Sequence, residues 1–134
     1  LSDDSGLEIE ALNMRPGIYS ARYKGLETNE QRRKAILDEL KGVENRKARF
    51  TTCICLIEED GKTNTFKGTW DGEISKQEYG ESGFGYDRIF IPNDANGKTS
   101  AQMGQDFKNK YSHRAKATKQ LLEYLNKKRD KNEL

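Results

Sequence analysis

The stretch "ARFTTCICLIEEDGKTNTFKGTW", residues 48–70, indicates a β-hairpin. Phe50 to Ile57 is rich in Thr, Ile, Phe and Cys, and β-branched and aromatic residues favour strands. "EEDGK" then supplies an Asp-Gly pair, which is a strong local signal for a tight turn between antiparallel strands. We therefore expect two antiparallel strands here, with the other elements arranged around them.

A helix is predicted on either side of this hairpin. Before it, "TNEQRRKAILDELKG" (residues 28–42) begins with Thr28 or Asn29 as a cap and ends at Gly42. After it, the clearest helix is predicted over residues 112–129, because apolar residues recur there at i, i+4, i+7 and i+8. These positions are Ala117, Leu121, Tyr124 and Leu125.

Three shorter elements complete the prediction. Residues 1–12, "LSDDSGLEIEAL", alternate polar and apolar after a Ser-Gly turn, which predicts a short strand beyond that turn. Residues 89–91 form an apolar run entered through a glycine-rich loop, which predicts another strand. Thr99 and Gln102 have the spacing of a capping box at a helix start.

Composition limits the classes of protein to which this chain can belong. Its 134 residues fit one domain, residues 1–134. With 34% charged residues and a mean hydropathy of −1.02, no apolar run reaches the ~18–20 residues needed to span a membrane. A net charge of +2 argues against a role in coating nucleic acid. Cys53 and Cys55 are expected to be buried thiols in a reducing, cytoplasmic setting.

The first candidate for chemistry is "DDSG", residues 3–6, where Asp3 and Asp4 are expected at a strand-to-loop junction. Paired carboxylate oxygens suit Mg²⁺, which prefers oxygen ligands and keeps several waters. One of the two carboxylates could also act as a general base toward a water molecule. The alternative interpretation is a solvated acidic turn without function.

The second candidate is "SHRAKA", residues 112–117, at the start of the last predicted helix. If Ser112 caps that helix, His113 and Arg114 fall in its first turn, where a cation is mildly unfavourable. Side chains that break a local rule often belong to functional sites, and here they could face a phosphate or a carbonyl-bearing ring. The alternative is an incidental surface histidine.

The third candidate is "GFGYD", residues 83–87. A purine could stack on Phe84 while Asp87 accepts a hydrogen bond from a ring N–H. The alternative is the entry to a strand with a core aromatic residue.

Taken in order, three longer motifs resemble the inosine triphosphate pyrophosphatase family. They are "DDSGLEIEALNMRPGIYSARYKG" (3–25), "GFGYDRIFIP" (83–92) and "KNKYSHRAKA" (108–117), and the resemblance runs from Leu1 to about Leu125. It implies an elongated α/β fold with a mixed, bent sheet flanked by helices, usually assembled as a homodimer. It also implies Mg²⁺-dependent hydrolysis of ITP, dITP and XTP to the monophosphate and pyrophosphate.

The same resemblance implies roles for individual residues. Asp4 corresponds to the family's proton acceptor and metal-site residue, with Asp3 as a possible second metal ligand. Donors aimed at O6 would favour a 6-oxo purine over adenine, since a 6-amino group would meet them donor to donor. The implied substrate-binding residues are Ser5, Phe84, Gly85, Tyr86, Asp87, Lys108, His113 and Arg114.

The chain also departs from the family pattern. Arg88 follows "FGYD" where Pro is common. The family's N-terminal strand, its Ser/Thr-x-x-Asn-x-x-Lys phosphate loop and an acidic metal ligand have no counterpart here, so the chain resembles the C-terminal two-thirds of a member. We therefore expect residues 1–134 alone to be poorly active, and unstable or self-associating. The alternative function is a catalytically inactive nucleotide-binding or dimerisation fragment.

Overall fold

The computed structural model describes residues 1–81 and 83–130, which form one antiparallel sheet flanked by helices. The sheet has the strand order β2-β1-β3-β4-β5, and each neighbouring pair is antiparallel. In chain order the elements are β1 (Ser2–Ile9), the 3-10 helix η1 (Glu10–Leu12), β2 (Arg15–Gly17), the 3-10 segment η2 (Ser20–Gly25), α1 (Asn29–Glu39), β3 (Lys47–Ile57), β4 (Thr63–Ile74), β5 (Phe90–Pro92), α2 (Ser100–Met103), α3 (Gln105–Tyr111) and α4 (His113–Asp130).

The β3–β4 hairpin is the longest feature of the sheet, and its prediction is confirmed. The two strands pair from Lys47 opposite Glu73 to Ile57 opposite Thr63, and Gly61 lies in the turn with a φ of 84°. Alternate residues of both strands are buried, including Phe50 and Trp70, which lie opposite each other. This period of two buries one face of the hairpin and leaves the other face largely exposed.

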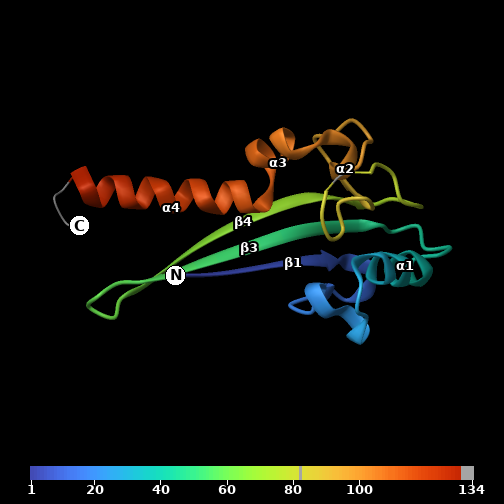
Figure 1. Ribbon diagram of the computed structural model, residues 1–134, viewed down its shortest axis with the longest axis horizontal. Coiled ribbons are helices and arrows are strands. Elements are labelled where there is room, and N and C mark those ends of the chain that lie inside the picture. Colours follow the sequence, from blue (N-terminus) through green and yellow to red (C-terminus); the bar gives the residue numbers. More distant parts are fainter. Residues whose placement is uncertain (82, 131–134) are drawn as a thin grey trace.

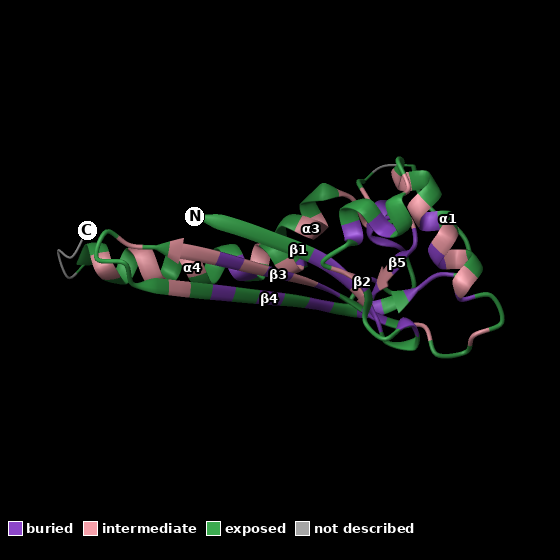
Figure 2. Cartoon of the chain, turned by 90° about the horizontal axis from the view of Figure 1, so that it is seen from below, coloured by how far each residue is buried: buried purple, intermediate pink, exposed green. Residues whose placement is uncertain are grey.

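Helix α4 covers the buried face of the hairpin from its middle to its tip (Figure 1). Its apolar stripe joins Ile54 and Phe66 through Ala117, with Leu121 and Tyr124 packed alongside. Figure 2 shows the result as buried positions that alternate with exposed ones along β4 and mostly with intermediate ones along β3. Cys53 and Cys55 lie on the side away from α4 and are half-buried rather than buried, because α4 covers only one face.

A larger core fills the other end of the molecule. There α1 packs against the sheet, and Ile36, Phe50, Trp70 and Phe90 belong to one buried cluster. The ring of Phe90 makes an edge contact with Phe50, with centroids 4.6 Å apart. Most of the buried apolar residues therefore lie at this end. The smaller cluster of Ile54, Phe66 and Ala117 lies between α4 and the hairpin.

Glycines allow two close approaches between elements. At Gly68 of β4, an added Cβ would overlap the carbonyl oxygen of His113, so the start of α4 lies directly on the strand. At Gly6 of β1, an added Cβ would overlap the carbonyl oxygen of Gly17 in β2. Neither contact leaves room for a side chain.

The predicted helices and caps are confirmed. Thr28 and Gln31 form a reciprocal capping box at α1, and Thr99 and Gln102 form another at α2. The α/β class is confirmed as well, although the strand pairs that the structure describes are all antiparallel rather than mixed. Of the helices in the described ranges, none combines the length and apolar character needed to cross a bilayer.

One predicted element was placed wrongly. "DDSG" was expected in a turn before a strand, but residues 3–6 lie inside β1. The reason is long-range pairing, since Asp3, Asp4 and Ser5 lie opposite residues 52–54 of β3. Ala11, expected to continue the strand, belongs to η1.

Candidate functional site

The two adjacent aspartates lie on opposite faces of β1. Asp3 and Ser5 share a face with Leu7, because side chains in a strand alternate. That is the face covered by α4, since Arg114 of α4 contacts both residues. Asp4 therefore projects to the other face, beside Cys53 in the register.

Arg114 joins the first motif to the third across 109 residues of sequence. Its Nη2 donates to Ser5 Oγ at 3.2 Å, and its Nε lies 3.5 Å from Asp3 Oδ2. Ser5 Oγ also lies 2.8 Å from Thr52 Oγ1, so the hydroxyl is fixed from the strand beside it. The guanidinium remains more than half exposed, which leaves N–H groups available to a ligand.

Asp4 differs from Asp3 in lacking a partner among the described residues. Within residues 1–81 and 83–130, no hydrogen bond or ion pair reaches its carboxylate, and the residue is exposed. It also stands where β1 forms the edge of the sheet, since β2 pairs only with Leu7 to Ile9. A free carboxylate beside an open strand edge is accessible to water and to a ligand.

His113 does not behave as a surface residue. Its ring stacks on Phe50, with centroids 4.8 Å apart and an interplanar angle of 15°. Burial lowers the pKa of His113 to about 4, with smaller contributions from Arg114 and Lys108, so the ring is neutral near pH 7. Its Nδ1 is buried and has no partner in the described part of the chain. Ser112 Oγ accepts from the Ala115 N–H at 3.1 Å, which confirms the predicted cap.

Asp87 joins the second motif to the third. Its carboxylate is almost fully buried and accepts from Lys108 Nζ at 2.7 Å. The same oxygen accepts from the Phe84 N–H at 2.8 Å, and the other oxygen accepts from Ser100 Oγ at 2.8 Å. Both oxygens are therefore engaged in holding the loop and α3, and Asp87 organises the loop whatever else it contacts.

Phe84 stands out from the loop that Asp87 organises. Its side chain is 80% exposed. The flanking Gly83 and Gly85 have φ values of 91° and 60°, a region that side chains rarely adopt. Tyr86, in contrast, is buried and donates through its hydroxyl to the carbonyl of Ser20 at 2.6 Å. The motif thus presents one ring outward and anchors the other.

Two residues of this region were missed by sequence reasoning. Arg33 of α1 is buried and contacts the loop, donating to the carbonyl of Gly85 at 2.8 Å. Its position three residues before Ile36 places it on the apolar stripe of α1, and that anomaly was the available signal. Gly68 allows the start of α4 to lie directly on β4. The only indication in the sequence was a glycine inside a predicted strand.

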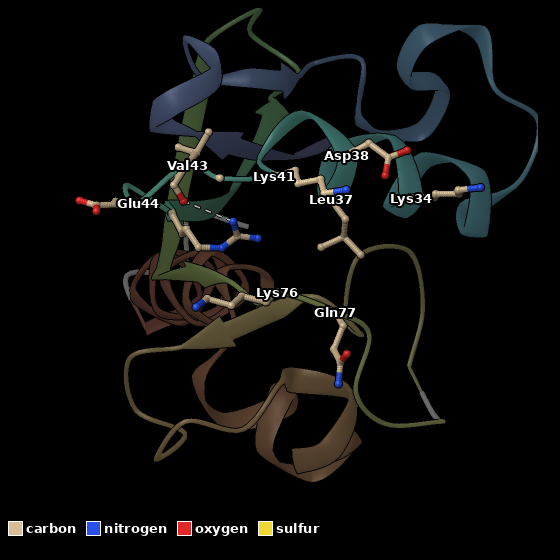
Figure 3. A pocket seen from close by; sticks show the side chains of 10 residues that line it. Lys34, Leu37, Asp38, Lys41, Val43, Glu44, Lys76 and Gln77 are labelled. Carbon is tan, nitrogen blue, oxygen red and sulfur yellow. Dashed lines mark hydrogen bonds between the residues drawn. The ribbon is translucent and has the colours of Figure 1, made fainter.

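A cavity of about 780 Å³ lies elsewhere, between α1 and the segment after β4 (Figure 3). Its lining includes Lys34, Lys41, Arg46 and Lys76. Arg46 is occupied with structure, because its guanidinium donates to the carbonyls of Leu40, Ile74 and Ser75. None of the three motifs contributes to this lining.

Asp3 and Asp4 differ in how well their carboxylates fit a divalent cation. Within the described residues, no three His, Cys, Asp or Glu side chains come together as a metal group. Asp3 and Asp4 cannot chelate one ion side by side, because they lie on opposite faces and Asp3 is paired with Arg114. Of the two, Asp4 offers the free oxygens, and Mg²⁺ accepts one protein carboxylate when substrate phosphates and water supply the rest.

The chain is similar to known proteins in both sequence and structure. A family model described as "Ham1 family" matches residues 1–124. A dITP/XTP pyrophosphatase of Staphylococcus epidermidis is 46% identical over 126 residues, covering 93% of this chain and 64% of that protein. A protein of the same name from Bacillus subtilis is 45% identical over 128 residues, with the same two coverages.

The chain is also similar to solved structures of proteins with these descriptions. The Staphylococcus aureus Ham1 protein superposes with a TM-score of 0.90 at 43% identity, covering 94% of this chain and 66% of that one. A nucleoside-triphosphatase described as a dITP/XTP pyrophosphatase from Mycobacterium abscessus gives a TM-score of 0.78 at 36% identity, covering 90% and 64%. The chain spans about 64% of the length of the curated relatives named above.

Proposed function

Because this chain belongs to the Ham1 family, we propose that it acts in the hydrolysis of non-standard purine nucleoside triphosphates. The reaction converts ITP, dITP or XTP to the monophosphate and pyrophosphate. The observation that carries the proposal is the meeting of all three motifs through two polar contacts, Arg114 with Ser5 and Lys108 with Asp87. The names of the relatives, dITP/XTP pyrophosphatase, support the substrate class.

In the proposed mechanism Asp4 is the proton acceptor. A water oxygen bonds to the α-phosphorus as the bond from that phosphorus to the bridging oxygen of the pyrophosphate breaks, and Asp4 takes the proton. Its lack of a partner within the described residues favours this role, since the carboxylate needs no rearrangement to accept. Asp4 would also hold Mg²⁺, which supplies positive charge to the phosphate oxygens when bound.

The cations of the third motif are proposed to bind the substrate. Arg114 and Lys108 stand close to the first and second motifs, where they can neutralise charge or donate to a ring oxygen. Ser5 adds a hydroxyl already oriented by Thr52. Positive donors here suit an anionic ligand better than a neutral one.

Base recognition is proposed to use Phe84 for stacking and Arg114 for selectivity. The exposed ring of Phe84 offers a face to a purine. Arg114 can donate to O6, and the neutral His113 beside it offers a single N–H. Gly85, Tyr86 and Asp87 complete the proposed pocket as the framework of the loop.

We also propose a homodimer located in the cytoplasm. Two residues of the loop after β2 support self-association, because Ile18 is 84% exposed and Tyr19 is 55% exposed. The loop that carries them is fixed, since Ser20 Oγ donates to the Gly17 carbonyl and accepts from the Leu7 N–H. Exposed apolar side chains on an ordered loop are typical of a protein contact. Light scattering on the purified chain, with Ile18→Asp as the comparison, measures this.

Release of pyrophosphate from ITP, with ATP in parallel, tests the activity. Faster release from ITP than from ATP is expected, and equal rates would contradict the assigned substrate class. The second candidate is an inactive nucleotide-binding fragment of such an enzyme. Calorimetry separates the two candidates, because such a fragment binds IMP and ITP equally, whereas an intact phosphate site binds ITP more tightly.

A further inference from the structure

We propose that Arg33 is a positioning residue that holds the Gly83–Asp87 loop, so that Phe84 is presented for stacking on a purine. The hold on the loop follows from contacts between described residues. The consequence for nucleotide binding rests on the proposed function.

Arg33 connects α1 to the segment after β4 through two hydrogen bonds, one of which reaches the loop. Its side chain is only 8% exposed, although it carries a full charge. Its Nε donates to Glu78 Oε1 at 2.9 Å, which neutralises the buried charge. Its Nη1 donates to the Gly85 carbonyl at 2.8 Å, one residue beyond Phe84.

Hydrogen bonds from within the loop and from α1 hold the loop in place. Its neck is closed by the Tyr79 N–H bonding to the Arg88 carbonyl at 2.9 Å. Beyond the neck, the Phe84 N–H is held by Asp87, and the Gly85 carbonyl is held by Arg33. The peptide group before Phe84 is thus held by Asp87, and the peptide group after Gly85 is held by Arg33. The glycines at 83 and 85 have no side chains with which to pack the loop themselves.

An arginine suits this task better than a lysine. Its planar guanidinium donates along two fixed directions, toward Glu78 and toward Gly85. A lysine ammonium reaches one of these acceptors with good geometry, and a methionine reaches neither. The three side chains therefore form a graded series at one position.

The experiment compares Arg33→Lys and Arg33→Met with Arg32→Met. Arg32 is a matched control, because it lies on the same helix and donates its hydrogen bonds to Asn29 Oδ1 and the Leu26 carbonyl rather than to the loop. In Arg33→Met, hydrogen exchange of residues 83–88 is expected to accelerate by about tenfold or more, with a smaller effect in Arg33→Lys. Exchange of the loop in Arg32→Met should match the wild type.

Nucleotide affinity gives the second measurement. By calorimetry with IMP, Arg33→Met is expected to weaken binding by about tenfold, within the range that loss of base stacking produces. The same change in a Phe84→Ala background should alter binding less than about twofold, since the two residues act through one contact. A purely structural loss would instead add to the Phe84→Ala effect.

Two outcomes would contradict the role of Arg33. Unchanged loop exchange in Arg33→Met overturns the inference, and so do additive effects with Phe84→Ala. If the wild-type chain binds no IMP, the proposed function fails, while loop exchange still decides whether Arg33 holds the loop. If Arg33→Met does not fold, Arg33→Lys carries both measurements, because its aliphatic stem fills the same space.

Discussion

At the scale of single residues, Asp3 and Asp4 differ clearly in their contacts. The two side chains are chemically identical and adjacent, yet one is tied to Arg114 and the other is free within the described residues. The difference arises only from strand alternation, which gives each carboxylate a different neighbourhood. Adjacent residues of one type therefore have different surroundings here.

Replacing each aspartate separately tests the consequence of that difference. Asp4→Asn is expected to lower pyrophosphate release from ITP by roughly 10²–10⁴-fold, the usual contribution of a general base, with little change in ITP affinity. Asp3→Asn is the matched variant, and it should mainly weaken nucleotide binding by freeing Arg114. Steady-state rates and calorimetry measure the two effects. Equal loss of rate and affinity in Asp4→Asn would remove it from the role of proton acceptor.

Burial of His113 predicts a pH dependence of stability. Its pKa is about 4 in the folded chain, against the ordinary histidine value of 6.5, so only the unfolded chain takes up this proton between those values. The stabilisation is complete above pH 6.5 and is lost as pH falls toward 4. From pH 7 to pH 5 the free energy of unfolding should drop by roughly 2 kcal/mol through this group.

Urea unfolding of the wild type and His113→Gln at pH 7 and pH 5 measures this contribution. The carboxylates Glu39 and Glu58, whose pKa values are lowered from 4.5, titrate mainly below that window. The variant should show a distinctly smaller change between the two pH values. An equal change in both proteins would contradict burial of a neutral His113.

At the scale of elements, the seating of α4 on β4 depends on Gly68. Gly68→Ala forces a methyl group against the His113 carbonyl, so α4 must shift or the protein must lose about 1–3 kcal/mol. Thr65→Ala on the exposed side of the same strand is the control, with little expected effect. Chemical denaturation gives the stabilities, and IMP affinity reports the shift of Arg114. A Gly68→Ala protein as stable as the control would show that this contact is loose.

The helices and strands were largely predictable from the sequence. The face of the sheet on which each site residue lies was not. The hairpin, α1 and α4 follow from local signals, namely an Asp-Gly turn, a capping residue and helical spacing. The placement of "DDSG" inside β1 depends on pairing with residues 52–54, almost fifty positions away. Arg33 is similar, because its loop contacts join α1 to residues 78 and 85. Such long-range contacts leave no periodic trace in the sequence.

At the scale of the whole molecule, the hairpin tip is fixed mainly by polar contacts with the end of α4. Tyr124 donates to Glu58 Oε1 at 2.8 Å and accepts from Asn64 Nδ2 at 3.1 Å, while Lys128 is paired with the same carboxylate. Figure 1 shows this tip far from the α1 end. A small contact group at the end of α4 therefore holds the hairpin tip.

Tyr124→Phe removes the hydroxyl while keeping the ring that packs on Phe66. Faster hydrogen exchange is expected at the hairpin tip, residues 57–63, with unchanged exchange in the loop around Phe84. The thermal midpoint should fall by only a few degrees, because the larger core lies elsewhere. Uniform acceleration across the whole chain would instead show that the two ends unfold as one unit.

The close approach of Gly6 to Gly17 fixes the register of β1. If β1 slid by one residue along β3, an aspartate would still occupy one of the two positions now held by Asp3 and Asp4. The same slide would bring Ser5 or Leu7 against the carbonyl of Gly17, where no side chain fits. The smallest residue of the motif thus decides which aspartate lies on the face of Arg114, so a methyl group at position 6 is expected to displace the proposed proton acceptor without touching either acid.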